Sequence, residues 1–323
     1  MVDSPAGVDV ASALGQVIDK LGEQLSNWGR WGEADEGGTL NLITERVRSR
    51  ASDCVRSGQA VSLALPVHSH YPQVPGGGRF NNQHVMTQTG TDALAEGAVS
   101  AYSDDAIAMS VHGHTHWDAL SHVFHRGRMF NGRSAALVTA QGAAANDVTA
   151  LARTMVTRGV LLDLAPDGGA LSRDHEITTA ELERAMTRQR VSVQEGDALL
   201  LRTGHLGTIR RSGRWKDFSA VGDCHPFEPG IGHACLPWLH EQGVAAVASD
   251  NWAVEVLRGP ATERLPVHEV AIVHMGMPLG EMFDLDALAA LCAADGHWDF
   301  LLCAAPLPIT GGVGGPVNPM AIR

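Results

Sequence analysis

The sequence predicts an α/β protein with a mixed sheet and flanking helices, and two observations lead to this prediction. Short apolar runs of the kind found in buried strands alternate along the chain with segments whose apolar residues recur at helical spacing. The chain, at 323 residues, is also long enough to bury a large core without disulfides. Such alternation favours a sheet covered by helices over an all-helical or all-strand fold.

The first third of the chain contains one clear helix and two strand-like runs. A helix is expected near residues 9–26, where the residues at helical spacing are Leu14, Val17, Ile18, Leu21 and Leu25. Residues 60–66 predict a strand that Pro66 ends, and residues 106–112 predict another. The glycine-rich run at 75–78 between them predicts a loop.

Further along the chain, strands and helices alternate more regularly. Strands are expected at 160–164, 198–201, 244–248 and 300–304. Helices are expected at 178–188, 234–242 and 285–294. Thr178 and Glu181 form a capping box, Asp284 is the expected N-cap of the last helix, and Gly243 and Gly296 are the expected terminators.

We interpret the chain as one compact domain over residues 31–323, preceded by a helical appendage at residues 1–30. Residues 205–233 are rich in glycine, proline and charge, which predicts an excursion over the surface or a lid.

Charge and cysteine content exclude several classes of protein. The net charge is -12 and no cluster of Lys and Arg occurs, which argues against nucleic acid as a partner. No apolar run approaches the ~18 residues of a membrane span, and the first residues lack the pattern of a signal peptide. The five cysteines form no CxxC pair, which favours a reduced, cytoplasmic protein and argues against a thiolate zinc site.

The chain is instead rich in histidine, with 16 residues, and residues 112–122 read His-Gly-His-Thr-His-Trp-Asp-Ala-Leu-Ser-His. A straight strand would separate His112 from His116 by roughly 13 Å. A helix would bring these two side chains together but turn Asp118 away from them. A shared metal ion therefore requires the backbone to bend here, and Gly113 supplies the freedom to bend.

The ligand chemistry of this segment is that of a catalytic metal. Two imidazoles from His112 and His116 and the carboxylate of Asp118 suit Zn²⁺, Mn²⁺ or Fe²⁺ and leave positions open for water and substrate. His122 is the candidate for proton transfer. His114 is not predicted to be a metal ligand.

Two aromatic residues and three short motifs bear on the substrate and on the class of enzyme. Trp117 and Phe124 flank the ligands and are candidates for binding an aromatic substrate, with core packing as the alternative. The chain lacks the GxSxG elbow of serine hydrolases, and neither His268-Glu269 nor His175-Glu176 continues into HExxH. The run 311–315 lacks the spacing of a dinucleotide loop and is expected to line the pocket.

The histidine segment resembles the signature HxGTHxDxPxH of the cyclase family, which includes bacterial kynurenine formamidase and isatin hydrolase. The matching residues are His112, Thr115, His116, Asp118 and His122. His114 replaces the glycine and Leu120 the proline of the signature, as in a longer-chain branch of the family. Similar stretches run from about residue 30 to the C-terminus, at 31–41, 129–132, 196–204, 249–251 and 311–319.

The resemblance implies a swivelling β/β/α domain in which His112, His116 and Asp118 bind a divalent metal ion, zinc or manganese, and His122 transfers protons. It implies one or two ions per chain, the second of which is held by Asp118 with His268 and Glu281. His274 is a rival for the position of His268. The resemblance also implies a homo-oligomer, either a dimer or a tetramer.

Together these patterns predict a metal-dependent hydrolase that acts on a small-molecule substrate. Water activated by the metal would attack the carbonyl of a C–N or C–O bond in a cyclic amide, a lactone or an N-acyl compound. Two alternatives remain at this point: a metal-dependent cyclase or dehydratase, and a non-catalytic metal-binding scaffold.

Overall fold

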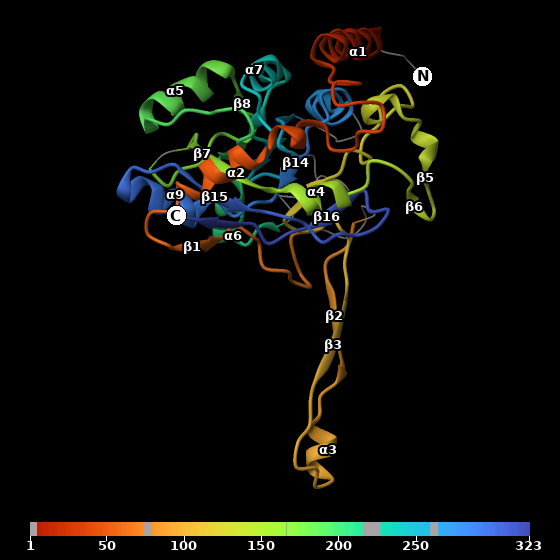
Figure 1. Cartoon of the computed structure of the whole chain (residues 1–323), viewed down its shortest axis with the longest axis vertical. Helices are drawn as coiled ribbons and strands as arrows, with labels where there is room; N and C mark the ends of the chain where they lie inside the picture. The colour runs from red at the N-terminus through yellow and green to blue at the C-terminus, as the bar shows by residue number, and fades with distance from the viewer. Residues whose placement is uncertain (1–4, 74–78, 166, 216–226, 259–263) are drawn as a thin grey trace.

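The centre of the molecule is a nine-stranded mixed sheet. The computed structural model describes residues 5–73, 79–165, 167–215, 227–258 and 264–323 (Figure 1). The strands of the sheet lie in the order β1-β17-β15-β7-β9-β12-β14-β4-β16. The central strands β7, β9, β12 and β14 are parallel, and the strands outside them run antiparallel to their neighbours. Their bounds are β1 Ala60–Ser62, β4 His116–Asp118, β7 Val156–Asp163, β9 Ala198–Arg202, β12 Ala246–Ser249, β14 Leu279–Glu281, β15 Asp299–Cys303, β16 Gly314–Pro316 and β17 Met320–Ile322.

The sheet divides the hydrophobic core into two layers. Leu199 and Leu201 of β9 join one buried cluster, together with Ile18. Leu200, between them, joins a second cluster with Phe300. A strand that is buried on both faces reads as a continuous apolar run, and this is why β9 could be recognised from the sequence.

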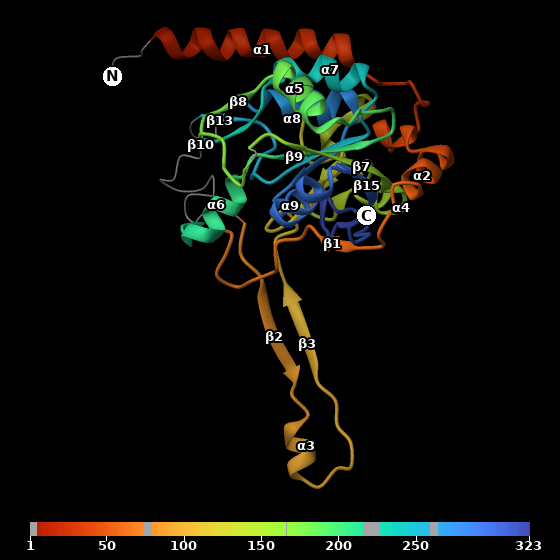
Figure 2. The ribbon, with the colours of Figure 1, turned by 90° about the vertical axis from the view of Figure 1, so that its left-hand side faces the viewer.

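Helices cover both layers. α1 lies across one end of the molecule, close to α7 and to the π-helix η6 (Figure 2). α5 packs beside β7, and α4 and α9 contribute to the second cluster. The helix bounds are α1 Pro5–Leu25, α2 Glu45–Ser52, α3 Thr91–Ala95, α4 Thr149–Thr154, α5 Thr179–Gln189, α6 His205–Ser212, α7 Leu236–Glu241, α8 Pro266–His268, η6 Glu269–Met275 and α9 Asp286–Asp295. None of these helices, within the described residues, has the length and apolar character that a membrane span requires.

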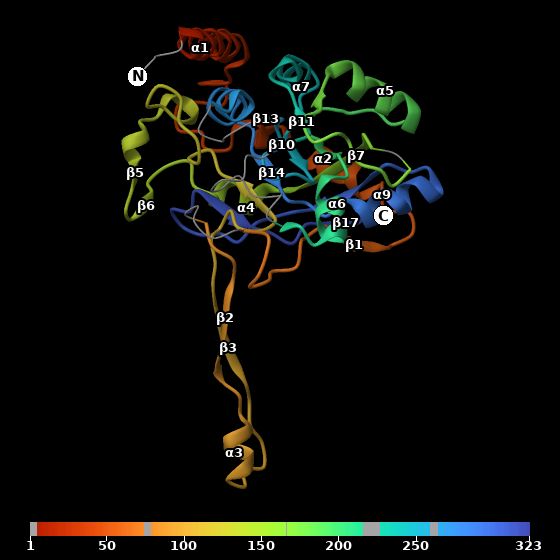
Figure 3. The same cartoon turned by 180° about the vertical axis from the view of Figure 1, so that it is seen from behind.

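Among the described residues, four further strand pairs lie outside the main sheet. The longest is a hairpin of β2 and β3 that projects from the body and carries α3 at its tip (Figures 1 and 3). The bounds of these pairs are β2 Gln83–Gln88 with β3 Asp104–Ala108, β5 Val138–Thr139 with β6 Gly142–Ala143, β8 Glu176–Ile177 with β11 Gly230–Ile231, and β10 Phe227–Glu228 with β13 Leu257–Arg258.

The α/β class with a mixed sheet and flanking helices is confirmed. The helix expected at 9–26 is α1, and the helix expected at 178–188 is α5, which has the capping box between Thr178 and Glu181. The strands expected at 160–164, 198–201, 244–248 and 300–304 are β7, β9, β12 and β15, with bounds shifted by a few residues. The four strands were predictable because every residue in them is buried or half-buried.

Several local predictions were wrong. The strand expected at 60–66 ends at Ser62, and the strand expected at 106–112 ends at Ala108, because it belongs to the projecting hairpin. Leu285 occupies the N-cap position of α9, and Asp284 instead pairs with Arg210. The expected surface excursion at 205–233 contains α6, β10 and β11, although residues 216–226 lie outside the described residues, as does the loop expected at 75–78.

A buried ion-pair network joins the sheet to α2. Arg158 of β7 lies 2.7 Å from Asp197 and 3.1 Å from Asp299. The side chain of Asp197 is completely buried and lies 2.8 Å from Arg50 of α2. Burial raises the pKa of Asp197, although Arg158 and Arg50 both oppose this effect. The ionised carboxylate therefore depends on its arginine partners.

We expect Arg158→Met to lower the free energy of unfolding by about 3–5 kcal/mol, since removing one partner leaves a buried carboxylate short of compensating charge. Urea denaturation would measure this loss. The matched control is Arg56→Met, because Arg56 also pairs with Asp299 but its side chain is 41% exposed. The control substitution should lower the free energy of unfolding by less than about 1 kcal/mol. Equal losses in the two variants would contradict the assignment.

Candidate metal centre

The histidine segment bends immediately before β4. Residues 111–115 form turns, and the amide of Gly113 donates to the carbonyl of Ser110 at 2.8 Å. The bend brings the rings of His112 and His116 edge to face, with their centroids 4.9 Å apart. A Cβ atom at position 113 would lie 2.9 Å from the Ser110 carbonyl oxygen. The close approach of the Ser110 carbonyl therefore requires glycine at position 113. The sequence had instead suggested that Gly113 supplies freedom for the backbone to bend.

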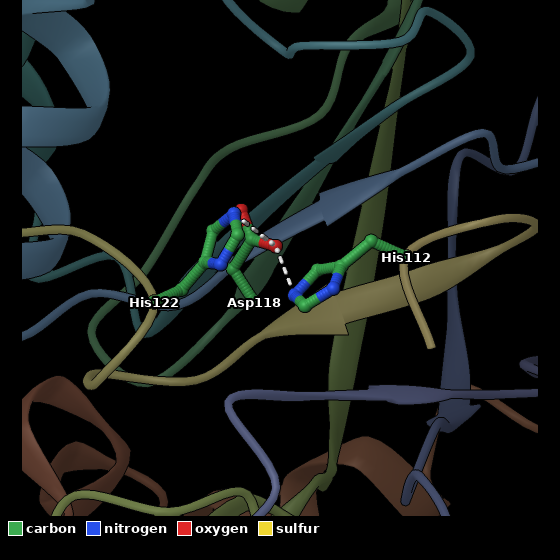
Figure 4. Close-up of side chains that lie close together, drawn as sticks. All are labelled: His112, Asp118 and His122. Carbon is green, nitrogen blue, oxygen red and sulfur yellow. Dashed lines mark ion pairs between the residues drawn. The ribbon is translucent and has the colours of Figure 1, made fainter. Parts of the chain in front are cut away.

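Asp118 lies at the centre of the histidine cluster. Its carboxylate is completely buried, and Oδ1 lies 3.5 Å from His112 Nε2 and 3.3 Å from His116 Nε2. Figure 4 shows His112 and His122 approaching the same carboxylate, with His122 Nε2 3.7 Å from Oδ1. Gly314 of β16 pairs with Asp118, and a Cβ atom there would lie 2.3 Å from His112 Nε2. Within the glycine-rich run 311–315, which was expected to line the pocket, Gly314 is the glycine that lies against His112.

Glu281 and His268 reach the same cluster from elsewhere in the chain. Glu281 of β14 is paired with His116 of β4, and its Oε2 lies 3.2 Å from His116 Nε2. His268 Nε2 lies 3.2 Å from Glu281 Oε1 and 3.6 Å from Asp118 Oδ2. The structure thus brings His268 into the cluster. His274, its rival, instead hydrogen-bonds with His125 and stacks on Trp28.

Hydrogen bonds fix the orientation of two of these imidazoles. His116 Nδ1 lies 2.7 Å from the carbonyl oxygen of His114, which can only accept a hydrogen bond. His268 Nδ1 lies 2.5 Å from Glu255 Oε1 in the same way. When Nδ1 carries the proton, the Nε2 lone pair points into the cluster, which is the usual arrangement of a metal-binding histidine and its carboxylate or carbonyl partner.

Strained backbone lies directly beside the two glutamates that contact His268. Val254, next to Glu255, has a φ angle of 58°, and so does Met282, next to Glu281. A β-branched residue rarely adopts this conformation, so Val254 must be held there by its surroundings. Asn251 accepts a hydrogen bond from the Val254 amide at 2.8 Å and thereby holds this turn.

Several buried atoms in the cluster lack a hydrogen-bond partner among the described residues. A buried polar atom without a partner costs free energy, so such a group of atoms indicates a missing ligand. Two sets of side chains place one ligand atom each within 4.8 Å of one another: His112 with Asp118 and His122, and His116 with Asp118 and Glu281. The unpartnered atoms are His112 Nε2, His116 Nε2, Asp118 Oδ1 and Oδ2, and Glu281 Oε2. Imidazole and carboxylate donors in this arrangement fit a divalent transition metal ion.

The electrostatics of the cluster also suit a cation. Burial lowers the pKa of His112 well below its ordinary value, which leaves its ring neutral. Burial opposes ionisation of Asp118, yet the surrounding His122, His116 and His112 hold its pKa well below the usual range. His116 is also buried, but hydrogen bonds to Asp118 and Glu281 raise its pKa to about 9. In the metal-free protein, a proton on His116 thus occupies a position that a metal ion would take.

His122 and Arg79 lie at the edge of the cluster. His122 stacks on His112 with centroids 4.1 Å apart, and its side chain remains 24% exposed. Arg79 donates to the carbonyl of His112 at 3.2 Å and lies 4.0 Å from Glu281 Oε2. The guanidinium also sits over the ring of Trp252, 4.7 Å from its centroid.

The aromatic prediction requires a correction. Trp117 is completely buried, donates to the carbonyl of Ala304 and packs against Phe283, so it belongs to the core. The physical reason is strand alternation: in β4, His116 and Asp118 point to one face and Trp117 to the other. Phe124 is 41% exposed, and its role in substrate binding stays a prediction.

Sequence reasoning missed Glu255 and Arg79. Glu255 is 2% exposed and accepts hydrogen bonds from the amides of Val267 and His268 as well as from the His268 ring. No local motif marked this residue, because its partner lies 13 positions away. Its position shortly after the Ser249-Asp250-Asn251 stretch was the only available signal.

We expect Glu255→Gln to weaken metal binding by about 10–100-fold, because the amide cannot hold the His268 tautomer as the carboxylate does. Titration of the metal-depleted protein with Zn²⁺ or Mn²⁺ would measure this change. Glu241→Gln, which neutralises a carboxylate on α7, is the control and should bind as the wild type does. Wild-type affinity in Glu255→Gln would refute a supporting role for Glu255.

Comparisons with known proteins identify relatives of this chain. A family model described as "Putative cyclase" matches residues 61–256. A crystal structure described as a novel cyclase is 35% identical, with a TM-score of 0.83, over 93% of this chain and 100% of that chain. No curated protein matches the sequence.

Two more distant structures share the fold. Isatin hydrolase A from Labrenzia aggregata is 21% identical, with a TM-score of 0.60, over 86% of this chain and 98% of that chain. A "predicted metal-dependent hydrolase" from Bacillus stearothermophilus is 18% identical, with a TM-score of 0.50, over 81% of this chain and 97% of that chain. The family model and the 35% identical structure show that this chain belongs to the cyclase family.

Proposed function

We propose that this protein is a metal-dependent hydrolase that cleaves a carbonyl C–N or C–O bond in a small cyclic amide, lactone or N-acyl substrate. The observation that carries the proposal is the convergence of buried, unpartnered imidazole nitrogens and carboxylate oxygens on one point, beside a partly exposed histidine. The fold shared with isatin hydrolases supports it, since isatin is a cyclic amide.

The residues divide into ligands and a proton-transfer group. His112, His116 and Asp118 would hold one zinc or manganese ion, and Asp118 would share a second ion with His268 and Glu281. A bound divalent ion of this kind polarises a substrate carbonyl and lowers the pKa of water from about 15.7 toward roughly 7. The side chains of His116 and Asp118 are completely buried, so they would keep such an ion away from bulk water.

His122 is suited to move the proton. Burial lowers its pKa, so the ring is neutral near pH 7 and able to accept a proton from the attacking water. Its partial exposure, 24%, leaves the ring open to the side from which a substrate arrives. Once protonated, the ring would donate to the departing nitrogen or oxygen and return to its neutral form.

Arg79 would stabilise negative charge on the substrate carbonyl oxygen. Its contact with the His112 carbonyl and its position over Trp252 hold the guanidinium beside the cluster. A fixed positive group at this place is worth most in the transition state, where the charge develops.

Metal content is the first test of this proposal. We expect one or two transition-metal ions per chain in the purified wild type, and their loss in His116→Ala, because this residue lies between Asp118 and Glu281. Plasma mass spectrometry would give the count. Chelation should abolish turnover of isatin or of another member of an amide and lactone panel, and added metal should restore it. If the wild type contains no metal even after reconstitution, the proposal of a metal-dependent hydrolase is overturned and a scaffold role is left.

We expect His122→Ala to retain its metal and lose about 10²–10⁴-fold in kcat, which is the usual contribution of a general acid–base group. His297→Ala, which removes an exposed imidazole from the end of α9, is the matched control and should keep full activity. Full activity in His122→Ala would exclude the assigned role.

Hydrolysis also requires one ¹⁸O atom from labelled water in the product, and a product without label would establish cyclisation or dehydration instead.

A further inference from the structure

The π-helix η6 begins immediately after His268. α8 ends at this histidine, and η6 runs from Glu269 to Met275, with every residue except His274 buried. π-helices are rare and are found frequently at functional sites. Their hydrogen bonds join residues five apart, whereas those of an α-helix join residues four apart. A change of η6 to the α-helical pattern would therefore shift one end of the segment relative to the other, and His268 lies at one of these ends.

The amino end of η6 is held by Glu255. One oxygen of this carboxylate accepts a hydrogen bond from the Val267 amide at 3.2 Å, and the other accepts from the His268 amide at 3.0 Å. Val267 and His268 are the two residues that precede η6. Glu255 therefore fixes the place where η6 starts.

The carbonyl end of η6 is held by two residues that follow α1. A helix leaves its last carbonyls without partners inside the helix. Here Trp28 Nε1 donates to the Val273 carbonyl at 2.7 Å. The Asn27 amide donates to the His274 carbonyl at 2.9 Å, and Asn27 Nδ2 donates to the Met275 carbonyl at 2.8 Å. Three successive carbonyls thus receive hydrogen bonds from two successive residues of a distant segment.

The position of these two donors depends on how closely α1 lies against η6. A Cβ atom at Gly22 would lie 2.7 Å from the His274 ring, so a larger residue there would have to displace the ring. The Trp28 indole stacks on the same ring, with centroids 5.4 Å apart. Asp19 of α1 also pairs with Arg126 at 2.8 Å. α1 lies across this end of the molecule in Figure 2, and these contacts fix it over η6.

We infer that Asn27 and Trp28 are positioning residues for His268. They hold the carbonyl end of η6 and thereby keep the π-helix in the form that directs His268 Nε2 toward Glu281 Oε1 at 3.2 Å and Asp118 Oδ2 at 3.6 Å. They act through the backbone of η6. The inference rests on the proposed function, in which these three side chains share the second metal ion.

The expected effect on metal binding is selective. The other ion would be held by His112, His116 and Asp118, which lie on neither α1 nor η6. Loosening the carbonyl end of η6 should therefore weaken the ion at His268 and leave the other ion unchanged. A general loss of stability would instead weaken both ions.

Calorimetric titration of the metal-depleted full chain with Mn²⁺ tests this selectivity. The test variant combines Asn27→Leu with Trp28→Phe, two changes that roughly keep side-chain size and remove both side-chain donors. The wild type should bind an ion that His268→Ala removes. The double variant should bind that ion about 10–100-fold more weakly, which is the usual effect of losing a group that orients a metal ligand.

The matched control is Trp31→Phe, which removes an indole N–H three positions after Trp28 and affects none of the three hydrogen bonds to η6. Both ions should bind to this variant as they do to the wild type. Equal weakening of both ions in the double variant, or a wild type whose metal binding does not change in His268→Ala, would overturn the inference.

Hydrogen exchange of the metal-free protein separates this inference from the proposed function. The amides of residues 269–275 should exchange at least about tenfold faster in the double variant than in the wild type, while those of β9 keep their rates. Unchanged exchange in η6 would contradict the inference whether or not metal binds. A wild type that binds no metal would overturn the proposed function, and faster exchange confined to η6 would still support the role of Asn27 and Trp28 in holding the backbone next to His268.

Discussion

The carboxylate of Asp118 is the constraint on which the rest of the site depends. It is completely buried, and the imidazoles of His112, His116, His122 and His268 approach it within 3.3–3.7 Å. A carboxylate in this position would be very costly without cationic compensation. The cluster is therefore suited to surround a cation. The surrounding structure keeps the imidazole nitrogens directed at the carboxylate.

That surrounding structure is built from segments far apart in the chain. Thr115 illustrates this, because its hydroxyl donates to the carbonyl of Met282 at 2.6 Å and accepts from the amide of Leu65 at 2.7 Å. Asp250 also joins distant segments. It follows β12, and its carboxylate accepts hydrogen bonds from the amides of Thr203 and Gly204, which follow β9. The strained turn at Val254 and the carboxylate of Glu255 follow directly after this anchor. Polar residues at strand ends thus fix the backbone beside the candidate metal centre by hydrogen bonds to the sheet.

The projecting hairpin of β2 and β3 and the candidate metal centre are two parts of the same segment of chain. The hairpin leaves the body shortly after Arg79 and returns shortly before His112, and Arg79 itself donates to the His112 carbonyl.

The sequence by itself predicted the α/β class with its mixed sheet and one half of the candidate site. Strands such as β9 are buried on both faces, so their apolar runs are local signals, and the spacing of His112, His116 and Asp118 required a bend that the structure contains. The matches at His268 and Glu281 came from resemblance, and only the pairing of β14 with β4 brought Glu281 next to His116. Tertiary structure alone decided that Trp117 is a core residue, that Glu255 orients His268, and that residues 83–108 leave the body. Each of these depends on contacts between residues distant in sequence or on the face to which a strand turns its side chains, and neither is encoded in a short stretch of chain.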